Sequence, residues 1–519
     1  MSIASEVRVT LLDLQTLLSR IRLEGEQETI LLSLEECIAF AMNQNPSILV
    51  ASITPDIASD RIVAAKSEFD PGVRASVEST ATKSVGLQRL SLFEMAQQAS
   101  PPERSSTEVS TWTIETGMGG KLPTGFTYDL SLKRSDSDQV VNVTGGDNTT
   151  EEDGIALAIT QPLLRGAGIR VNRAEIGKAE AGLAISEAEL HLLQQNTVAD
   201  AIQTYWQLVG AYAALRVKES AVRTAEQLLN ETQERNELGA SSELDVLTAQ
   251  SAVARRQNDL INAYADVGLA SDRLKQILNL RDGDLLSSAI ILATSKTPEL
   301  DMDGLNDGEP VDQRVRGALE RRPELHVKDA QQAIAELTLR QRRNARYPLV
   351  DLTGRYVQID SENDFNGLLI GDSSANSDSW SVGLKASVPI GNRRARAEYR
   401  IAERQFDQIQ LERDEIRTLI DEDVRRASRQ TAKSGVLVEN ARKTVTLEQA
   451  RFKAEQERFL FGDSTAFHLI QVQDDLIIEE TRLALAETQL LAAIADLQRA
   501  EGILLSDLKI DTAVEPISE

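Results

Sequence analysis

The chain has 519 residues and a formal net charge of −25, from 56 Lys and Arg against 81 Asp and Glu. This charge argues against a nucleic-acid partner, because a phosphate backbone would be repelled. Three His and one Cys disfavour a conventional metalloenzyme and exclude an internal disulfide, so no cofactor, metal site or catalytic centre is expected.

The start of the chain reads as an extension ahead of the main fold. It lacks the basic start, apolar core and small-residue cleavage site of a signal peptide, so none is expected. Cys37 lies in an amphipathic helical pattern and is expected to pack in a core. No run reaches the roughly 18 apolar residues that a membrane-spanning helix needs.

An internal repeat organises the sequence. QERNELGAS at 233 to 241 recurs as QERFLFGDS at 456 to 464, an offset of 223. Pro46 and Pro71 match Pro323 and Pro348 at an offset of 277, and the larger offset is attributed to extra residues in the loops of the first half. We predict an N-terminal extension, repeat one, an equatorial linker, repeat two and a C-terminal tail, at residues 1 to 30, 31 to 280, 281 to 308, 309 to 503 and 504 to 519.

Each repeat is predicted to contain a short helix, strands, a very long helix, a tight turn and a medium helix. In repeat one, residues 172 to 236 contain no Pro and carry apolar residues at coiled-coil spacing: Val198, Ile202, Tyr205, Val209 and Tyr212. Such a helix is ~100 Å long and is matched by one at about 393 to 459. A short helix at 32 to 68 and a medium helix at 243 to 280 would run end to end beside it.

Two segments alternate strictly between apolar and polar residues, at 125 to 133 and at 379 to 389. Further strands are predicted at 73 to 80, 109 to 117, 154 to 162 and 349 to 358. Polar stretches at 83 to 108, 134 to 152 and 360 to 378 are predicted to be loops.

Strands of this kind, about 9 to 11 residues long with one apolar face, suit a transmembrane β-barrel, although a small soluble sandwich has the same pattern. The residues predicted to face the membrane are Phe126, Tyr128, Leu130, Trp380, Val382 and Leu384. One chain has too few strands for a barrel with an open lumen, so several chains would share one barrel and pack their helices into a tube.

The chain resembles the TolC-like outer-membrane efflux proteins. The resemblance spans about residues 31 to 503 and rests on the duplicated plan, on LSLEECIAFAMNQNP at 32 to 46, on KLPTG at 121 to 125 and on ITQPLLRGAGIRVNRA at 159 to 174. It implies a mixed α and β fold of long helical hairpins, in which three chains share one barrel of about twelve strands in the outer membrane of a Gram-negative-type cell. It also implies a tunnel through the periplasm whose tip docks an adaptor (membrane fusion) protein coupled to an inner-membrane transporter.

The resemblance places a pore constriction near the tip. Asp245 lies six residues after Gly239, where the family has a constricting carboxylate. The competing interpretation is that Ser241, Ser242 and Asp245 merely cap the helix and stabilise its N-terminus by charge, and the two roles are compatible. At the equivalent place repeat two has His468 and then Gln471, which departs from the acids common in the family. His468 is either a pH-sensitive constriction or a solvated surface residue, since imidazole ordinarily titrates near pH ~6.5.

The turns themselves are predicted to dock the adaptor, since a Gly turn allows close backbone approach, although turn geometry alone also explains the Gly. These candidate docking residues are Leu238, Gly239, Ala240, Phe461, Gly462 and Asp463.

We therefore predict a passive outer-membrane channel for efflux or type I secretion, with a soluble coiled-coil scaffold as the alternative. The cargo, the pump and the adaptor stay open. So does the question whether the hairpin at 109 to 133, which is extra relative to repeat two, enters the barrel.

Overall fold

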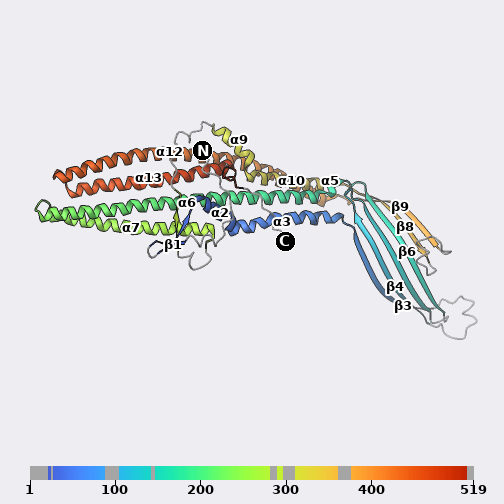
Figure 1. Ribbon diagram of the computed structural model, residues 1–519. Coiled ribbons are helices and arrows are strands. Elements are labelled where there is room, and N and C mark those ends of the chain that lie inside the picture. Colours follow the sequence, from blue (N-terminus) through green and yellow to red (C-terminus); the bar gives the residue numbers. More distant parts are fainter. Residues whose placement is uncertain are drawn as a thin grey trace, which may run out of the picture. The chain divides into compact units, whose positions relative to one another are not determined.

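The computed structural model describes residues 21–24, 27–87, 104–141, 146–280, 289–295, 310–360 and 376–510 (Figure 1). The chain divides into two compact units, each built from separate segments. Unit 1 is drawn from residues 1–57, 184–330 and 411–519, and unit 2 from residues 58–183 and 331–410.

Two helical hairpins account for most of the helix. The long helices are α6 (Ala174–Glu237) and α12 (Arg393–Phe461), and each is followed after a short turn by a medium helix, α7 (Glu243–Leu278) or α13 (Ala466–Glu501). These confirm the predicted long and medium helices. The two medium helices have 36 residues each, and their first residues lie 223 positions apart, as the repeat in the sequence requires.

The predicted short helix at 32 to 68 is in fact two helices, α2 (Leu34–Gln44) and α3 (Pro46–Lys66), followed by the 3-10 turn η1 (Ser67–Phe69). The break lies at Asn45, whose backbone is extended because a following proline disfavours the helical region. Repeat two breaks in the same way at Arg322, between α9 (Val311–Arg321) and α10 (Pro323–Asn344). The Asn45 side chain donates to the carbonyl of Ile277 at 3.0 Å, so the end of α2 lies beside the end of α7.

A small sheet joins segments that we predicted to be an extension and a linker. Strand β2 (Gln27–Leu32) pairs antiparallel with β1 (Ile21–Glu24) and parallel with β7 (Ile290–Ala293). The sequence pattern did not predict these strands, because they are short and β2 finds its partner about 260 residues away. Two one-turn helices, α5 (Ile169–Asn172) and α14 (Leu504–Asp507), complete the helical elements of the described chain.

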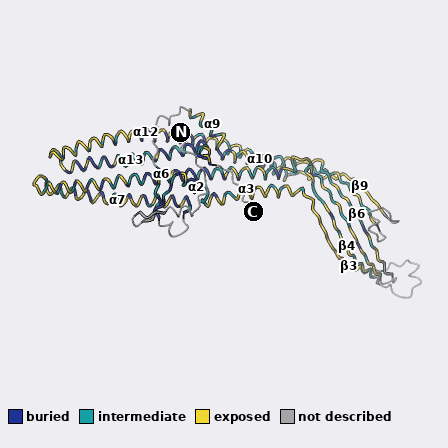
Figure 2. Tube along the Cα trace, viewed as in Figure 1, coloured by how far each residue is buried: buried dark blue, intermediate teal, exposed yellow. Residues whose placement is uncertain are grey.

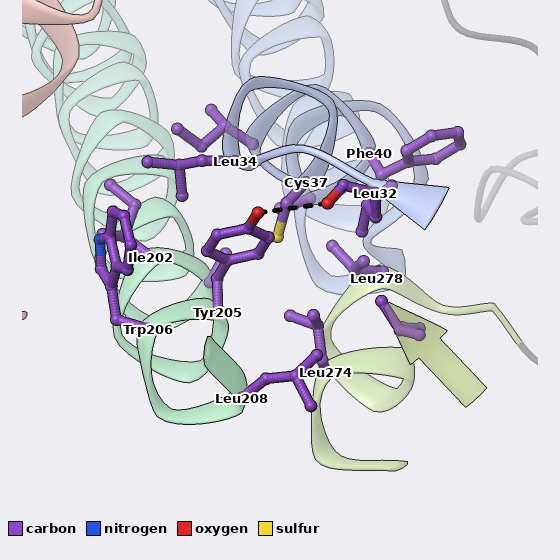
Figure 3. Packing of buried hydrophobic residues seen from close by; sticks show 14 of the residues in the cluster. Leu32, Leu34, Cys37, Phe40, Ile202, Tyr205, Trp206, Leu208, Leu274 and Leu278 are labelled. Atoms are coloured by element: carbon purple, nitrogen blue, oxygen red, sulfur yellow. Dashed lines mark hydrogen bonds between the residues drawn. The ribbon is translucent and has the colours of Figure 1, made fainter. Parts of the chain in front are cut away.

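The largest buried cluster lies in unit 1 and contains the predicted seam of α6. Val198, Ile202, Tyr205 and Val209 are buried there, and Tyr212 packs partly buried against them. The Tyr205 hydroxyl donates to the carbonyl of Leu32 at 3.2 Å (Figure 3). Cys37 is fully buried in this cluster, which confirms its predicted packing role and raises the pKa of its thiol.

Unit 2 contains a six-stranded antiparallel sheet in the order β3-β4-β5-β6-β8-β9 (Figure 1). Its strands are β3 (Gly72–Leu87), β4 (Arg104–Lys121), β5 (Thr127–Val141), β6 (Gly146–Pro162), β8 (Leu349–Asp360) and β9 (Asn376–Ser387). All six predicted strands are present. The hairpin predicted at 109 to 133 is β4 and β5, and it lies inside the sheet between β3 and β6.

The strands are longer than predicted. Both ends of the segments predicted to be loops, 83 to 108 and 134 to 152, belong to strands, so the loop predictions were wrong there. Most of 134 to 152 belongs to β5 and β6. The polar residues there pair across strands, as Arg134 does with Glu151 at 2.9 Å. Apolar alternation therefore marked only the part of each strand that has one apolar face.

Among the helices in the described part of the chain, none is both long enough and apolar enough to span a membrane. Exposure is greatest at the helical turns and along the edge strands β3 and β9, which Figure 2 shows in yellow.

Candidate functional site

The two helical turns are the exposed ends of the hairpins in unit 1. Gly239 and Gly462 have φ of +76° and +83°, a left-handed conformation that favours glycine. Beside them Leu238 and Phe461 are each 84% exposed. The predicted docking residues therefore lie at exposed turns, and their role in docking stays a prediction.

Asp245 takes part in a capping box at the start of α7. The Ser242 backbone N–H and hydroxyl donate to its carboxylate at 3.1 and 2.6 Å, while the Asp245 N–H donates to the Ser242 hydroxyl at 3.1 Å. These bonds, with that from Ser241, hold the pKa of the Asp245 carboxyl below its usual value. The structure thus shows the capping role of Ser242 and Asp245, and the constricting role of the same carboxylate stays a prediction.

The second turn lacks this reciprocal cap. Thr465 accepts a hydrogen bond from the His468 N–H at 3.4 Å, and His468 occupies the position in α13 that Asp245 has in α7. The side chains of His468 and Gln471 are exposed, and the His468 ring meets Phe467 edge-on with centroids 5.9 Å apart. The carboxylate of Glu455, whose pKa is lowered chiefly by a hydrogen bond from Ser464, is electrostatically coupled to His468.

Two arginines, neither of which the sequence interpretation singled out, connect the hairpins near their turns. Arg235 on α6 donates to the carbonyl of Phe459 on α12 at 2.6 Å and stacks on its ring at 4.8 Å. Arg256 on α7 forms an ion pair with Asp474 on α13 at 2.5 Å. Arg235 belongs to the repeated QER motif and could have been identified from that repeat, whereas no sequence pattern distinguishes Arg256.

The six-stranded sheet gathers the predicted membrane-facing residues on one face. Tyr128 and Leu130 lie on β5, and Trp380, Val382 and Leu384 lie on β9. Residues that lie opposite one another in the strand register form a row across this face. Every strand contributes an apolar residue to one such row: Val73, Met118, Leu130, Leu157, Tyr356 and Trp380.

Phe126 is the exception, because β5 starts at Thr127 and Phe126 belongs to the turn before it. Gly125 in this turn has φ of +91°, and a Cβ there would come within 2.4 Å of the Gly166 carbonyl. The backbone therefore turns at Gly125 and cannot continue as a strand, and the alternating pattern did not reveal this.

The opposite face of the sheet is polar and carries charges of both signs. The basic residues on this face include Arg74, Lys133, Arg355 and Lys385, and the acidic residues include Glu115, Asp129 and Asp351. The acidic excess of the chain is therefore not concentrated on this face. Among the described residues, no group of three or more His, Cys, Asp or Glu side chains is placed to hold a metal ion.

The two sequence motifs of the strand-to-helix junction contact each other. The N–H of Gly168, from the RGAG segment, donates to the carbonyl of Thr124, from the KLPTG segment, at 3.0 Å. The Asn172 side chain donates to the carbonyl of Gly166 at 2.8 Å, and the Gly166 N–H donates to Asn344 at 2.8 Å. These bonds fix the course of the chain between β6 and α6.

Comparisons with known proteins agree with this arrangement. The family model described as "Outer membrane efflux protein" matches residues 123–280 and 315–502. The outer membrane efflux protein BepC of Brucella suis is 20% identical over 354 residues, which cover 68% of this chain and 73% of BepC.

Solved structures show the same fold. The CmeC outer membrane channel of Campylobacter jejuni superposes with a TM-score of 0.62 at 15% identity, covering 91% of this chain and 86% of CmeC. VceC of Vibrio cholerae gives a TM-score of 0.60 at 14% identity, covering 90% and 96%.

Proposed function

Because the chain belongs to the outer membrane efflux protein family, we propose that three copies assemble into one channel that crosses the outer membrane and continues into the periplasm. The chain is a TolC-like transport protein of the outer membrane, not an enzyme. In the proposed trimer each copy gives its sheet to a shared barrel and its helical hairpins to a shared tunnel.

The observation that carries this proposal is the open sheet with one continuous apolar face. Within the described chain, its edge strands β3 and β9 each have a neighbour on one side only. In lipid, every unpaired backbone group costs several kcal/mol, so a sheet whose apolar face meets lipid has to close without free edges. Pairing β9 of one copy with β3 of the next achieves that closure.

The polar face then lines the lumen. Its charges of both signs keep the pore hydrated without selecting strongly for one ion. Transport through such a lumen requires no bond-making, so the conduit is passive and its cargo is selected by the proteins that load it.

The helical turns are the proposed periplasmic tip. Leu238 and Phe461, together with Leu244 at 72% and Phe467 at 60% exposure, offer apolar contacts to a periplasmic adaptor, which couples the channel to an inner-membrane transporter. Asp245, His468 and Gln471 lie within the first two turns of α7 and α13 and are the proposed pore constriction.

The experiment that tests the assembly is the native mass of the protein extracted with detergent from isolated outer membranes. We expect a species near three times the 56.9 kDa of one chain after subtraction of the bound detergent. A monomer or dimer in the soluble fraction would instead favour a coiled-coil scaffold, and the channel proposal would be abandoned.

A further inference from the structure

We infer that the β4–β5 hairpin is an insertion into the wall of the membrane barrel, so that three copies build a barrel of eighteen strands. The inference rests on the trimeric channel proposed above and concerns the number of strands that each copy contributes. Four strands per copy, as the resemblance implied, would make twelve.

Corresponding elements of the two repeats locate the insertion. β3 and β8 begin 277 residues apart, as α3 and α10 do, whereas α7 and α13 begin 223 residues apart. Repeat one therefore has 54 additional residues between the start of β3 and the start of α7, since 277 exceeds 223 by 54. Repeat two passes from α10 to α12 through two strands and repeat one passes from α3 to α6 through four, so the additional residues account for β4 and β5.

The inserted hairpin is paired along its length on both sides. β4 follows β3 from Gly72 opposite Gly119 to Leu87 opposite Arg104, and β5 follows β6 from Thr127 opposite Thr160 to Val141 opposite Gly146. Its turn also contacts the strand-to-helix junction through Thr124. The hairpin therefore runs the full height of the sheet and is not a flap attached at one end.

The side chains on the polar face also pack in a way that requires β4 to lie between β3 and β5. Arg74 on β3 reaches across β4 to Asp129 on β5, with Nη2 donating to Oδ1 at 2.6 Å. It passes over two glycines of β4: a Cβ at Gly117 would lie 3.1 Å from the Arg74 guanidinium, and one at Gly119 would lie 2.9 Å from the Asp129 carboxylate. Larger residues at these positions would force the Arg74 and Asp129 side chains to shift, and a Cβ at Gly117 would also meet the Leu130 carbonyl at 2.9 Å.

The apolar face continues across the hairpin without a break. Met118 and Leu130, both 43% exposed, lie between Val73 of β3 and Leu157 of β6 at one level. On the same face Tyr128 covers Gly120, where a Cβ would meet the Tyr128 hydroxyl at 2.8 Å. A hairpin outside the barrel would not need to present lipid-facing residues level with those of its neighbours.

Each copy contributes an even number of strands, which also allows the barrel to close. All five strand pairs are antiparallel, so β3 and β9 run in opposite directions, and β9 of one copy meets β3 of the next as an antiparallel neighbour. With strands ~4.8 Å apart and tilted by ~40°, eighteen strands form a barrel ~36 Å across between backbones, against ~24 Å for twelve.

The test places a fluorophore on single cysteines introduced by Leu130→Cys on β5, Leu384→Cys on β9 and Ser131→Cys on the polar face of β5. The trimer is reconstituted in vesicles of phospholipids with brominated acyl chains, which quench only fluorophores in contact with lipid. The wild-type protein is the labelling blank, because its Cys37 is buried. Met118→Cys on β4 is a second hairpin position should Leu130→Cys fold poorly.

We expect the labels at 130 and 384 to be quenched by the brominated chains to a similar degree, and the label at 131 to be quenched only by aqueous iodide. Quenching at 384 without quenching at 130 and 118 would place the hairpin outside the barrel and overturn the inference while leaving the channel intact. Absence of lipid quenching at all of these positions would refute the membrane barrel itself, and with it the proposed function.

Discussion

At the scale of single residues, Asp245 combines a capping role with a proposed constricting role. We predict that Asp245→Ala raises the single-channel conductance of the reconstituted trimer several-fold, because it removes a ring of three carboxylates from the pore. It also removes the bond from the Ser242 N–H to the carboxylate, but the Asp245 backbone N–H still donates to the Ser242 hydroxyl, so the N-cap of α7 is kept. Ser242→Ala is the matched control, since it removes the hydroxyl that caps α7 but keeps the carboxylate. Equal conductance changes in the two variants would show that the cap, and not the carboxylate ring, controls the pore.

His468 permits a separate prediction on pH. Its protonation adds positive charge at the proposed constriction, so we predict that the conductance differs between pH 5 and pH 8 in the wild type and is constant in His468→Ala. Asp245 does not confound this comparison. Because its folded pKa is lowered, its capping contribution is complete above the pKa of the unfolded carboxyl and is lost only as the pH falls through the lower folded value. A wild type that conducts equally at pH 5 and pH 8 would end the proposal for His468.

At the scale of elements, the ion pair between Arg256 and Asp474 connects the first hairpin to the second. Arg256 is almost fully buried, whereas Asp474 is 44% exposed, so removal of the carboxylate leaves a poorly solvated guanidinium at the contact between α7 and α13. We predict that Asp474→Asn weakens this contact by about 1–2 kcal/mol, after allowance for the exposure of Asp474. Hydrogen exchange in the tip halves of α7 and α13 would measure the loss as faster exchange.

The neighbouring residue supplies the control for that experiment. Asp475 pairs with Arg451 of α12 at 3.0 Å, so its ion pair lies within one hairpin and not between two. Asp475→Asn should leave the exchange of α7 unchanged. If both variants accelerate exchange in α7 alike, the contact between the hairpins does not depend on the Arg256 pair.

At the scale of the whole molecule, deletion of residues 104–141 tests the consequence of the insertion. The deletion removes β4, its turn and β5, and it leaves β3 and β6 with opposite directions and free to pair. We predict that the variant still forms a trimer, with twelve strands and a barrel ~24 Å across in place of ~36 Å.

The quantity to measure is the size of the largest poly(ethylene glycol) that enters the pore through the β-barrel end. Entry of the polymer is detected as a change in conductance. The deletion variant should exclude polymers that enter the wild type. A trimeric variant that admits the same polymers as the wild type would contradict the contribution of β4 and β5 to the barrel.

The sequence by itself determined the long and medium helices, the positions of the Gly turns, the existence of six strands and the apolar face of two of them. These are local properties: a seam such as Val198 to Val209 depends on residues one or two helical turns apart, and strand alternation depends on residues two positions apart. The same locality explains the capping interpretation of Asp245, whose hydrogen-bond partner lies three residues before it.

Only the tertiary structure decided the pairings between distant segments. Alternation marks Leu130 as lying on an apolar face but cannot say that Met118 and Leu157 flank it, nor that Gly117 and Gly119 make room for Arg74 to reach Asp129. The pairing of β2 with β7 and of Arg256 with Asp474 likewise joins residues more than 200 positions apart. Such pairs depend on which surfaces meet once every element has packed, and no local pattern carries that information.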